Sequence, residues 1–181
     1  ILFIDSDDGL IYDEAIADML DEIGESDLLI SAYVRKNGKK NKVVSLEKLT
    51  KKCSKDELLN ALLKKGHTFY YSVLWNKLYK TEIIRANNIS FDNKMTWGED
   101  FCFNMLYYSA IKNLSYSEKP KYCYERSFKG QTWRTMYQIP QNIYKKLRLY
   151  NEYKNLYKKN ARLNGNRIKI FLYIFKASIS E

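Results

Sequence analysis

The chain has 181 residues and a formal net charge of +10, and hydrophobic residues make up 45% of it. This length suits one domain or part of a larger one, and only 7 glycines and 2 prolines exclude a linker-like or disordered chain. Three widely separated cysteines show no metal-ligand spacing and favour reduced thiols in the cytoplasm. No apolar run reaches the length of a membrane-spanning helix.

The chain opens on a short apolar run that ends in a group of carboxylates. Ile1 to Ile4 predict a buried strand. Asp5, Asp7 and Asp8 follow at its carboxyl end, which is the edge at which open α/β sheets bind ligands. Crowded carboxylates repel each other, so a divalent cation such as Mg²⁺ or Mn²⁺, carrying a phosphate, would neutralise them. A solvated acidic turn is the equal alternative.

The following elements alternate between helices and strands. Periodicity and end signals predict helices at 13–23, 54–65, 82–86, 101–110, 140–159 and 167–176, strands at 28–34, 89–91 and 121–126, and a charged loop at 35–42. Asp13 is the expected cap of the first helix, whose apolar stripe is predicted to hold Ile16, Met19, Leu20 and Ile23. A buried opening strand also needs neighbours that the sequence does not supply before it, so we expect an N-terminal part to be missing.

The last part of the chain, 135–181, predicts a basic amphipathic helical tail. Its final helix carries an apolar run from Ile168 to Phe175, flanked by Arg167, Lys169 and Lys176. Such a pattern favours contact with an anionic membrane surface, and an ordinary helix packed on the core is the equal alternative. Nucleic acid is the weaker partner, because its phosphates would repel the acidic opening.

Two carboxylates after a glycine form the second candidate site. Glu99 and Asp100 follow Gly98 at the start of a helix, where acids are also stabilising without any function. Trp97 next to them is typical of a sugar-stacking surface. A carboxylate close to an apolar ring would have a raised pKa, which suits a general base.

Other candidates each have a structural alternative, which for Trp75 is the favoured one. Trp75 could stack on a ligand and Lys77 could reach a phosphate, but the same residues fit an aromatic core patch. Arg126 opens a stretch of cations and hydroxyls that suits either a phosphate-binding loop or a charged surface loop. His67, the single histidine, is expected to be structural.

Together these motifs resemble the family 2 glycosyltransferases of bacteria, which build polysaccharides and surface glycans. The resemblance rests on Asp5-Ser6-Asp7-Asp8 after an apolar strand, Leu-Trp-Asn-Lys-Leu-Tyr-Lys from Leu74, Gly-Glu-Asp-Phe-Cys-Phe-Asn from Gly98, and Tyr-Cys-Tyr-Glu-Arg from Tyr122, in that order. It covers 1–134. It implies an α/β GT-A fold, a Rossmann-like nucleotide-diphospho-sugar transferase that here lacks its N-terminal half, followed by the basic tail at 135–181.

The resemblance also implies roles for particular residues. Asp7 would ligate Mg²⁺ or Mn²⁺ on the donor diphosphate, and Asp5 would contact the ribose or the sugar. Asp100, with Glu99 in the same motif, would be the base that activates the acceptor hydroxyl in an inverting transfer. Further residues implied are Lys77 and Arg126 for the donor and Trp97 and Trp75 for the acceptor, although Glu125 interrupts the family's usual Tyr-x-Tyr-Arg spacing before Arg126.

The implied partners are a nucleotide-diphospho sugar and a glycan or lipid-linked acceptor, in a cytoplasmic protein that is peripheral at the inner face of the membrane. Two other functions stay open. A haloacid-dehalogenase-type phosphatase begins with a similar acidic motif, but Asp8 interrupts its Asp-x-Asp-Gly-Thr pattern and Leu10 stands where the threonine belongs. A basic nucleic-acid-binding module would explain the net charge but not the acidic opening.

Overall fold

The computed structural model describes residues 1–38, 40–45, 51–65, 69–95, 98–125 and 139–176. The chain forms two compact units, each drawn from separate stretches of sequence. We call Ile1–Lys55, Leu74–Ala86 and Ile111–Lys129 the sheet unit, and Asp56–Val73, Asn87–Ala110 and Gly130–Glu181 the helical unit. The domain boundary predicted at residue 134 lies outside the described residues.

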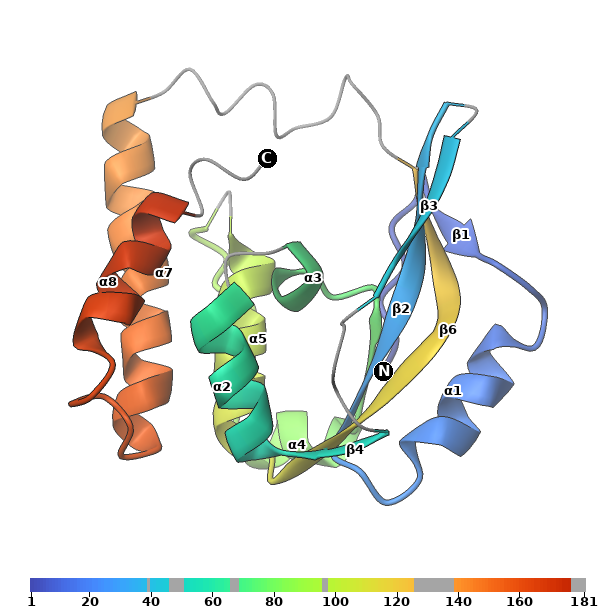
Figure 1. Cartoon of the computed structure of the whole chain (residues 1–181), viewed down its shortest axis with the longest axis horizontal. Helices are drawn as coiled ribbons and strands as arrows, with labels where there is room; N and C mark the ends of the chain where they lie inside the picture. Colours follow the sequence, from blue (N-terminus) through green and yellow to red (C-terminus); the bar gives the residue numbers. More distant parts are fainter. Residues whose placement is uncertain (39, 46–50, 66–68, 96–97, 126–138, 177–181) are drawn as a thin grey trace. The chain divides into compact units, whose positions relative to one another are not determined.

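The sheet unit is built around two long parallel strands, β2 (Leu28–Asn37) and β6 (Asn113–Glu125). Four short strands pair antiparallel with them in the described six-stranded sheet: β1 (Gly9–Leu10) and β4 (Lys52–Ser54) on β6, and β3 (Lys40–Val44) and β5 (Lys77–Tyr79) on β2. The carboxyl ends of β2 and β6 therefore meet at one edge of the sheet (Figure 1). The predicted α/β fold is confirmed.

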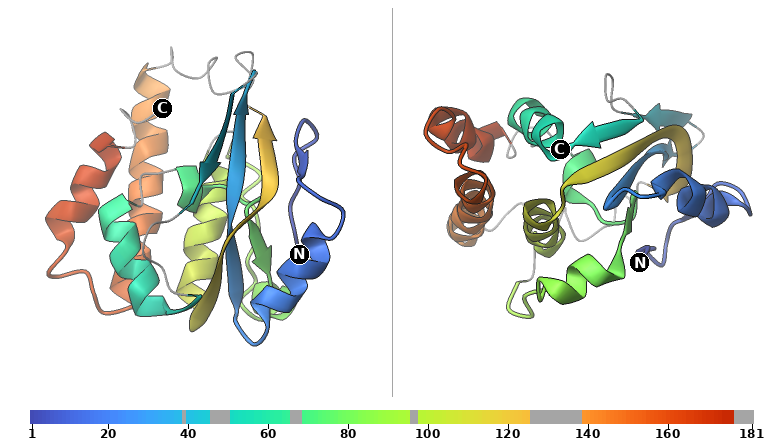
Figure 2. Two further views of the ribbon diagram at one scale, coloured as in Figure 1. Left: turned by 45° about the vertical axis from the view of Figure 1, so that its right-hand side comes forward. Right: turned by 90° about the horizontal axis from the view of Figure 1, so that it is seen from below.

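The charged stretch 35–42 is a hairpin rather than the predicted loop. β2 extends to Asn37 and turns at Gly38, whose φ of +57° suits a tight hairpin turn, into β3 (Figure 2). Arg35 pairs with Lys42 and Lys36 with Asn41. Apolar periodicity could not identify β3 or the end of β2, because lysine, arginine and asparagine fill most of 35–42.

The opening segment is a sheet-edge segment rather than a buried strand, so this prediction was wrong. The Ile1 nitrogen donates to the Tyr79 carbonyl at 2.6 Å, and the Tyr79 N–H donates to the Ile1 carbonyl at 2.9 Å. Leu2 bridges Leu78 and packs on the core of the sheet unit, whereas Ile1 and Ile4 are 46% and 50% exposed. The segment is therefore only partly buried, through Leu2 and Phe3.

Helix α1 (Ala15–Ile23) covers part of the sheet with a narrower apolar face than predicted. Met19 and Ile23 are buried, whereas Ile16 and Leu20 are 42% and 58% exposed. The helix starts at Ala15 with no side-chain cap, so the cap predicted at Asp13 was wrong. A second, short helix of this unit, α4 (Thr81–Ala86), follows β5 and agrees with the predicted helix.

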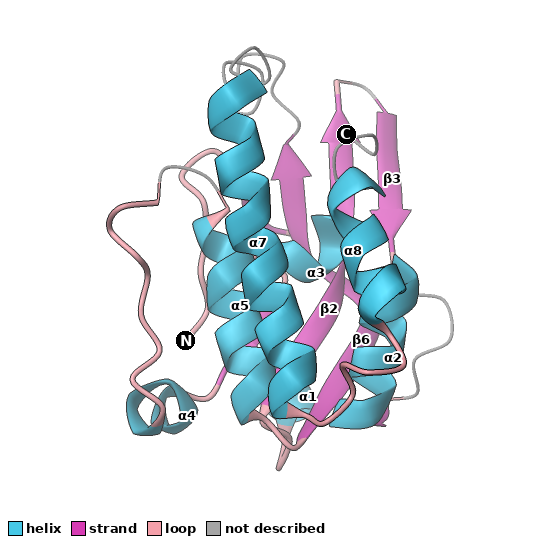
Figure 3. Ribbon diagram, turned by 90° about the vertical axis from the view of Figure 1, so that its left-hand side faces the viewer, coloured by secondary structure: helices cyan, strands magenta, loops and turns pink. Residues whose placement is uncertain are grey.

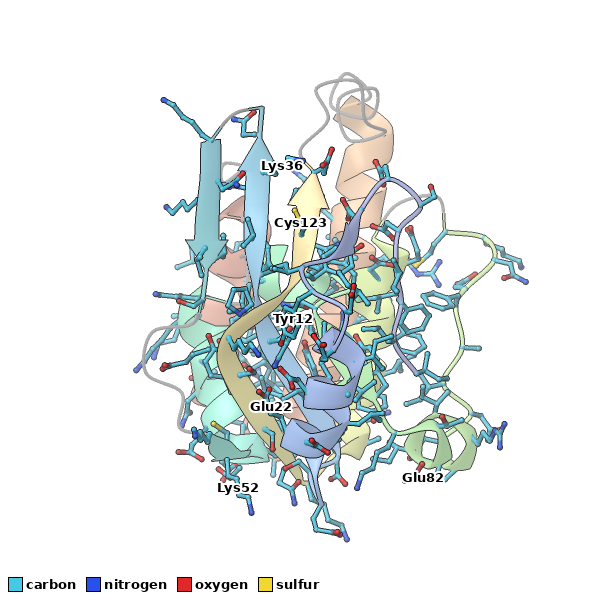
Figure 4. All side chains as sticks on the ribbon, turned by 90° about the vertical axis from the view of Figure 1, so that its right-hand side faces the viewer. Tyr12, Glu22, Lys36, Lys52, Glu82 and Cys123 are labelled. Atoms are coloured by element: carbon cyan, nitrogen blue, oxygen red, sulfur yellow. The ribbon has the colours of Figure 1, made fainter. Side chains whose placement is uncertain are left out.

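A buried lysine joins α1 to β6. The fully buried Lys121 donates from Nζ to Glu22 at 2.8 Å, to the Tyr12 hydroxyl at 3.0 Å and to Asp18 at 3.3 Å. Figure 4 shows Tyr12 and Glu22 on the α1 side of β6. Burial lowers the pKa of Lys121, but the hydrogen bonds to Glu22 and Tyr12 outweigh it and leave that pKa raised. The ammonium therefore stays charged and holds helix and strand together.

We expect Glu22→Gln to lower the free energy of unfolding by about 1.5–3 kcal/mol, the usual worth of a hydrogen bond to a charged group. Because the pKa of Lys121 is raised, this stabilisation is complete below the ordinary lysine value of 10.5 and is lost only as pH rises through the raised pKa. Urea unfolding at pH 7 measures it. Glu25→Gln, in the exposed turn after α1, is the matched control and should stay within about 0.5 kcal/mol.

The described helices of the helical unit are α2 (Lys55–Lys65), which begins at the unit's border, α3 (Phe69–Ser72), α5 (Glu99–Ala110), α7 (Ile139–Lys159) and α8 (Arg167–Lys176) (Figure 3). Two buried tyrosines hold α7 on α2: Tyr153 donates to the Leu62 carbonyl at 2.7 Å and Tyr157 to the Leu59 carbonyl at 2.6 Å. Residues 89–91 form no strand, so that prediction was wrong. Phe91 instead stacks on Phe103 of α5.

The predicted tail helices are confirmed as α7 and α8. Ile170 is fully buried, whereas Ile168, Phe171 and Leu172 are 76%, 50% and 46% exposed. Among the side chains described in α8, Ile170 thus packs inward and Phe171 meets the Tyr150 ring of α7 edge-on, while Ile168 and Leu172 face solvent. In the described part of the chain, no helix is both long and apolar enough to cross a membrane. Contact with a membrane surface stays a prediction.

Candidate functional site

The acidic opening forms a tight turn at the sheet edge where β2 and β6 end. The Asp8 N–H donates to the Asp5 carbonyl at 3.2 Å. Both carboxylate oxygens of Asp8 are used for anchoring: one accepts the Glu125 N–H at 2.8 Å and the other accepts the Tyr122 hydroxyl at 2.9 Å. The same hydroxyl accepts the Asp5 N–H at 3.0 Å. β6 therefore holds the turn at both of its ends.

The three carboxylates of this turn divide into two kinds. Asp8 is half-buried and hydrogen-bonded, whereas the side chains of Asp5 and Asp7 are exposed. Partial desolvation by the residues of the turn raises the pKa of Asp5 even though much of its side chain is exposed, and the charge of Asp7 raises that pKa further. Burial also raises the pKa of Asp8, against the hydrogen bonds from Glu125 and Tyr122. A cation would relieve this accumulation of negative charge, and Asp5 and Asp7 are the two carboxylates exposed to receive it.

These two carboxylates suit Mg²⁺ or Mn²⁺ through their donor atoms. Among the described residues, no group of three or more His, Cys, Asp or Glu side chains could enclose a metal ion. Mg²⁺ is commonly bound by one or two carboxylates together with substrate phosphates rather than by an all-protein cage. The exposed Asp5–Asp7 pair fits such a shared site.

Four aromatic rings support the turn from within the sheet unit. Trp75 stacks on Tyr122 at 4.5 Å and on Tyr124 at 5.4 Å, and Tyr33 meets it edge-on at 4.6 Å. Trp75 is only 3% exposed, so the structure places it in an aromatic core patch. Lys77 is fully buried and donates to the Asn76 side chain at 2.7 Å. Both residues lie inside the sheet unit rather than on its surface.

The second carboxylate pair opens α5 of the helical unit. The helix begins at Glu99, two residues earlier than predicted, so Glu99 and Asp100 both occupy its first turn. Asn104 anchors this turn by donating to the Asp100 carbonyl at 3.0 Å and to the Ser72 carbonyl at 2.7 Å. Glu99 Oε2 is buried and has no hydrogen-bond partner among the described residues. An unsatisfied carboxylate oxygen of this kind is costly for folding alone and is a feature of functional sites.

Cys102 follows this pair one turn along the helix. Burial raises the pKa of its thiol to about 12, and the charges of Glu152 and Glu99 add to the effect. The thiol therefore stays protonated at neutral pH and does not act as a nucleophile. The cysteines Cys53, Cys102 and Cys123 are all free, as the sequence predicts.

Gly98, directly before α5, has a backbone conformation and a close neighbour that disfavour any larger residue. Its φ is +81°, and a Cβ built on it would lie 2.8 Å from the Leu149 side chain of α7. We expect Gly98→Ala to lower the free energy of unfolding by about 1–3 kcal/mol through backbone strain and crowding. Gly24→Ala, with φ +47° but no atom closer than 3.9 Å, is the control for strain alone. Equal losses in urea unfolding would contradict the crowding.

Two expected site residues, Trp97 and Arg126, lie outside the described part of the chain, and so does His67, which the sequence predicts to be structural. Sequence reasoning in turn missed the roles of Asp8 and Tyr122. The alternation of Tyr122 and Tyr124 along β6 correctly indicated a shared face, which Trp75 covers. No local pattern indicated that the Tyr122 hydroxyl would reach the acidic turn.

Comparison with known proteins gives a consistent result, although no family model matches the chain. The poly(ribitol-phosphate) β-N-acetylglucosaminyltransferase TarS of Staphylococcus aureus, strains Mu50 and MW2, is 26% identical over 151 residues, which are 82% of this chain and 25% of TarS. The chain therefore spans about a quarter of the length of the curated relatives it matches.

Solved structures agree. The crystal structure of S. aureus TarS 1–349 in complex with UDP-GlcNAc matches with a TM-score of 0.65 and 24% identity, over 94% of this chain and 48% of that one. A structure of TarS 1–349 without that ligand matches with a TM-score of 0.55 and 18% identity, over 97% and 64% of the two chains. The chain is therefore a homologue of part of the glycosyltransferase TarS and shares the fold of about half of the TarS 1–349 structure that contains UDP-GlcNAc.

Proposed function

We propose that the chain is part of an inverting glycosyltransferase that moves a sugar from a nucleotide-diphospho donor to a glycan, polymer or lipid-linked acceptor. The 151-residue match to TarS carries this proposal, because TarS is a β-N-acetylglucosaminyltransferase. Since a TarS structure contains UDP-GlcNAc, that nucleotide sugar is the first donor to test. A phosphate-bearing polymer is the corresponding first acceptor.

The acidic turn supplies the donor part of the proposed reaction. Asp7 is the proposed ligand of Mg²⁺ or Mn²⁺, and Asp5 the proposed contact to the ribose or the sugar. The cation, when bound, would stabilise the negative charge that grows on the leaving diphosphate. The exposure of both side chains and the anchoring of the Asp8 carboxylate by Tyr122 and Glu125 support these roles.

The start of α5 supplies the proposed base. Asp100 would accept the proton of the acceptor hydroxyl while that oxygen attacks the anomeric carbon from the face opposite the leaving diphosphate. The bond to the diphosphate breaks as the new glycosidic bond forms, so a single displacement inverts the anomeric configuration. Glu99 is proposed to act beside Asp100 in the same motif. One of its carboxylate oxygens is buried and has no hydrogen-bond partner among the described residues.

A donor-hydrolysis screen of the full-length protein tests the function. We expect release of UDP from UDP-GlcNAc, above other nucleotide sugars, that requires Mn²⁺ or Mg²⁺ and stops with EDTA. A parallel assay with p-nitrophenyl phosphate tests the phosphatase alternative. Phosphate release from that ester without turnover of any nucleotide sugar would overturn the proposal.

Co-sedimentation with anionic liposomes, with and without residues 167–176, tests whether the tail helix contacts a membrane surface.

A further inference from the structure

We propose that Tyr122 is a positioning residue for the donor site: its hydroxyl closes the acidic turn and thereby sets the exposed Asp5–Asp7 pair for the cation and the donor diphosphate. The proposal rests on the proposed function, in which this pair binds the donor. Tyr122 itself would touch neither donor nor cation. Its effect would pass through the backbone of Asp5 and the carboxylate of Asp8.

A single hydroxyl group joins both ends of the turn. The Tyr122 oxygen accepts the Asp5 N–H at 3.0 Å, and its one proton is donated to Asp8 at 2.9 Å. The proton therefore has a defined direction, because the Asp5 N–H can only donate and the Asp8 carboxylate can only accept. Two hydrogen bonds in series polarise one another, so each is stronger for the presence of the other.

The ring that carries this hydroxyl is held rigidly. Tyr122 is 1% exposed, lies in β6 opposite Leu10 of β1, and stacks on Trp75. The Glu125 N–H, three residues further along β6, donates to the other oxygen of Asp8 at 2.8 Å. The hydroxyl thus projects from a fixed strand, and the turn adapts to the strand rather than the reverse.

The turn needs such a clamp because its own charges oppose it. Asp5, Asp7 and Asp8 fall within four residues, and no described lysine or arginine forms an ion pair with any of them. Without the hydroxyl, the half-buried Asp8 carboxylate would lose one of its two hydrogen bonds and would be pushed outward by its neighbours. The cation and the donor would then have to order the turn when they bind, and this would lower their affinity.

Tyr122→Phe tests the proposal, because it keeps the stacked ring and removes only the hydroxyl. Tyr124→Phe, on the same face of β6 and stacked on the same Trp75, is the matched control. In the full-length protein we expect Tyr122→Phe to weaken Mn²⁺-dependent UDP binding by about tenfold, the effect of one hydrogen bond to a charged group. Calorimetric titrations with Mn²⁺ and with EDTA give the metal-dependent part. KM for the donor should rise by a similar factor and kcat should change little.

A second readout needs no ligand. Amide hydrogen exchange of the turn, whose Asp8 N–H is bonded to the Asp5 carbonyl, should accelerate in Tyr122→Phe and stay unchanged in Tyr124→Phe. Unchanged exchange in Tyr122→Phe would overturn the proposal, whether or not the protein binds UDP. Faster exchange with unchanged UDP affinity would overturn the positioning role and leave a purely structural one. Failure of the wild type to bind UDP would count against the proposed function instead.

A double-mutant cycle tests the route of the effect. Asp8→Asn changes the acceptor of the same hydrogen bond, so its effect on UDP affinity and that of Tyr122→Phe should not add in the double variant. Additive effects would show that the hydroxyl acts by another route and would overturn the proposal. Circular dichroism of each variant checks that the fold is retained.

Discussion

Asp100→Asn should reduce kcat for sugar transfer by about 10²- to 10⁴-fold, the usual contribution of a positioned general base. The substitution keeps the size of the side chain and its place in the first turn of α5, but it removes the group that accepts the proton. Mn²⁺-dependent UDP binding should stay within a factor of about two, because the donor residues are untouched. Initial rates of transfer at saturating donor, together with UDP titration, measure both effects.

The alternative explanation of Asp100 is that an acid at a helix start only stabilises the helix. Such an acid contributes about 0.3–1 kcal/mol to stability. Glu82→Gln in the first turn of α4 is the matched control, since it removes the same kind of charge from another helix start. We expect similar small losses of unfolding free energy in both variants and loss of transfer only in Asp100→Asn. Wild-type turnover of Asp100→Asn would refute the assignment of the base.

Asp7→Asn should have the opposite kinetic signature and act on donor binding. Loss of a residue that hydrogen-bonds to a metal ligand lowers metal affinity by about 10- to 100-fold. Loss of the proposed ligand itself should therefore weaken Mn²⁺-dependent UDP binding by at least about 100-fold. Binding of UDP in EDTA should change little. Calorimetric titration of UDP at several Mn²⁺ concentrations separates the two contributions.

Asp13→Asn, a few residues later and equally exposed, controls for the general loss of negative charge in this part of the chain. It should bind UDP like the wild type at every Mn²⁺ concentration. If Asp7→Asn and Asp13→Asn lost the same modest affinity, long-range charge and not metal ligation would explain the effect, and Asp7 would not be the ligand.

The sequence by itself predicted the elements whose signals are local. The helices now seen as α7 and α8 follow an apolar periodicity, with a break at Gly165-Asn166, and both were placed within one residue of their observed ends. The α/β alternation and the position of the acidic group after an extended segment were equally readable. Such patterns depend on residues three or four positions apart, so they can be recognised in the sequence without knowledge of the fold.

The tertiary structure decided which polar side chains act together, because their partners are remote in sequence. Tyr122 reaches Asp8 across 114 positions of the chain, and Lys121 reaches Glu22 across 99. Burial of Trp75 and Lys77 likewise follows from strand pairing and not from their own motif. The acidic turn was visible as a cluster of charges, but only the fold separates an anchoring Asp8 from the exposed Asp5 and Asp7. Asp8 differs from the other two because the end of β6 brings the Tyr122 hydroxyl and the Glu125 N–H within hydrogen-bonding distance of its carboxylate.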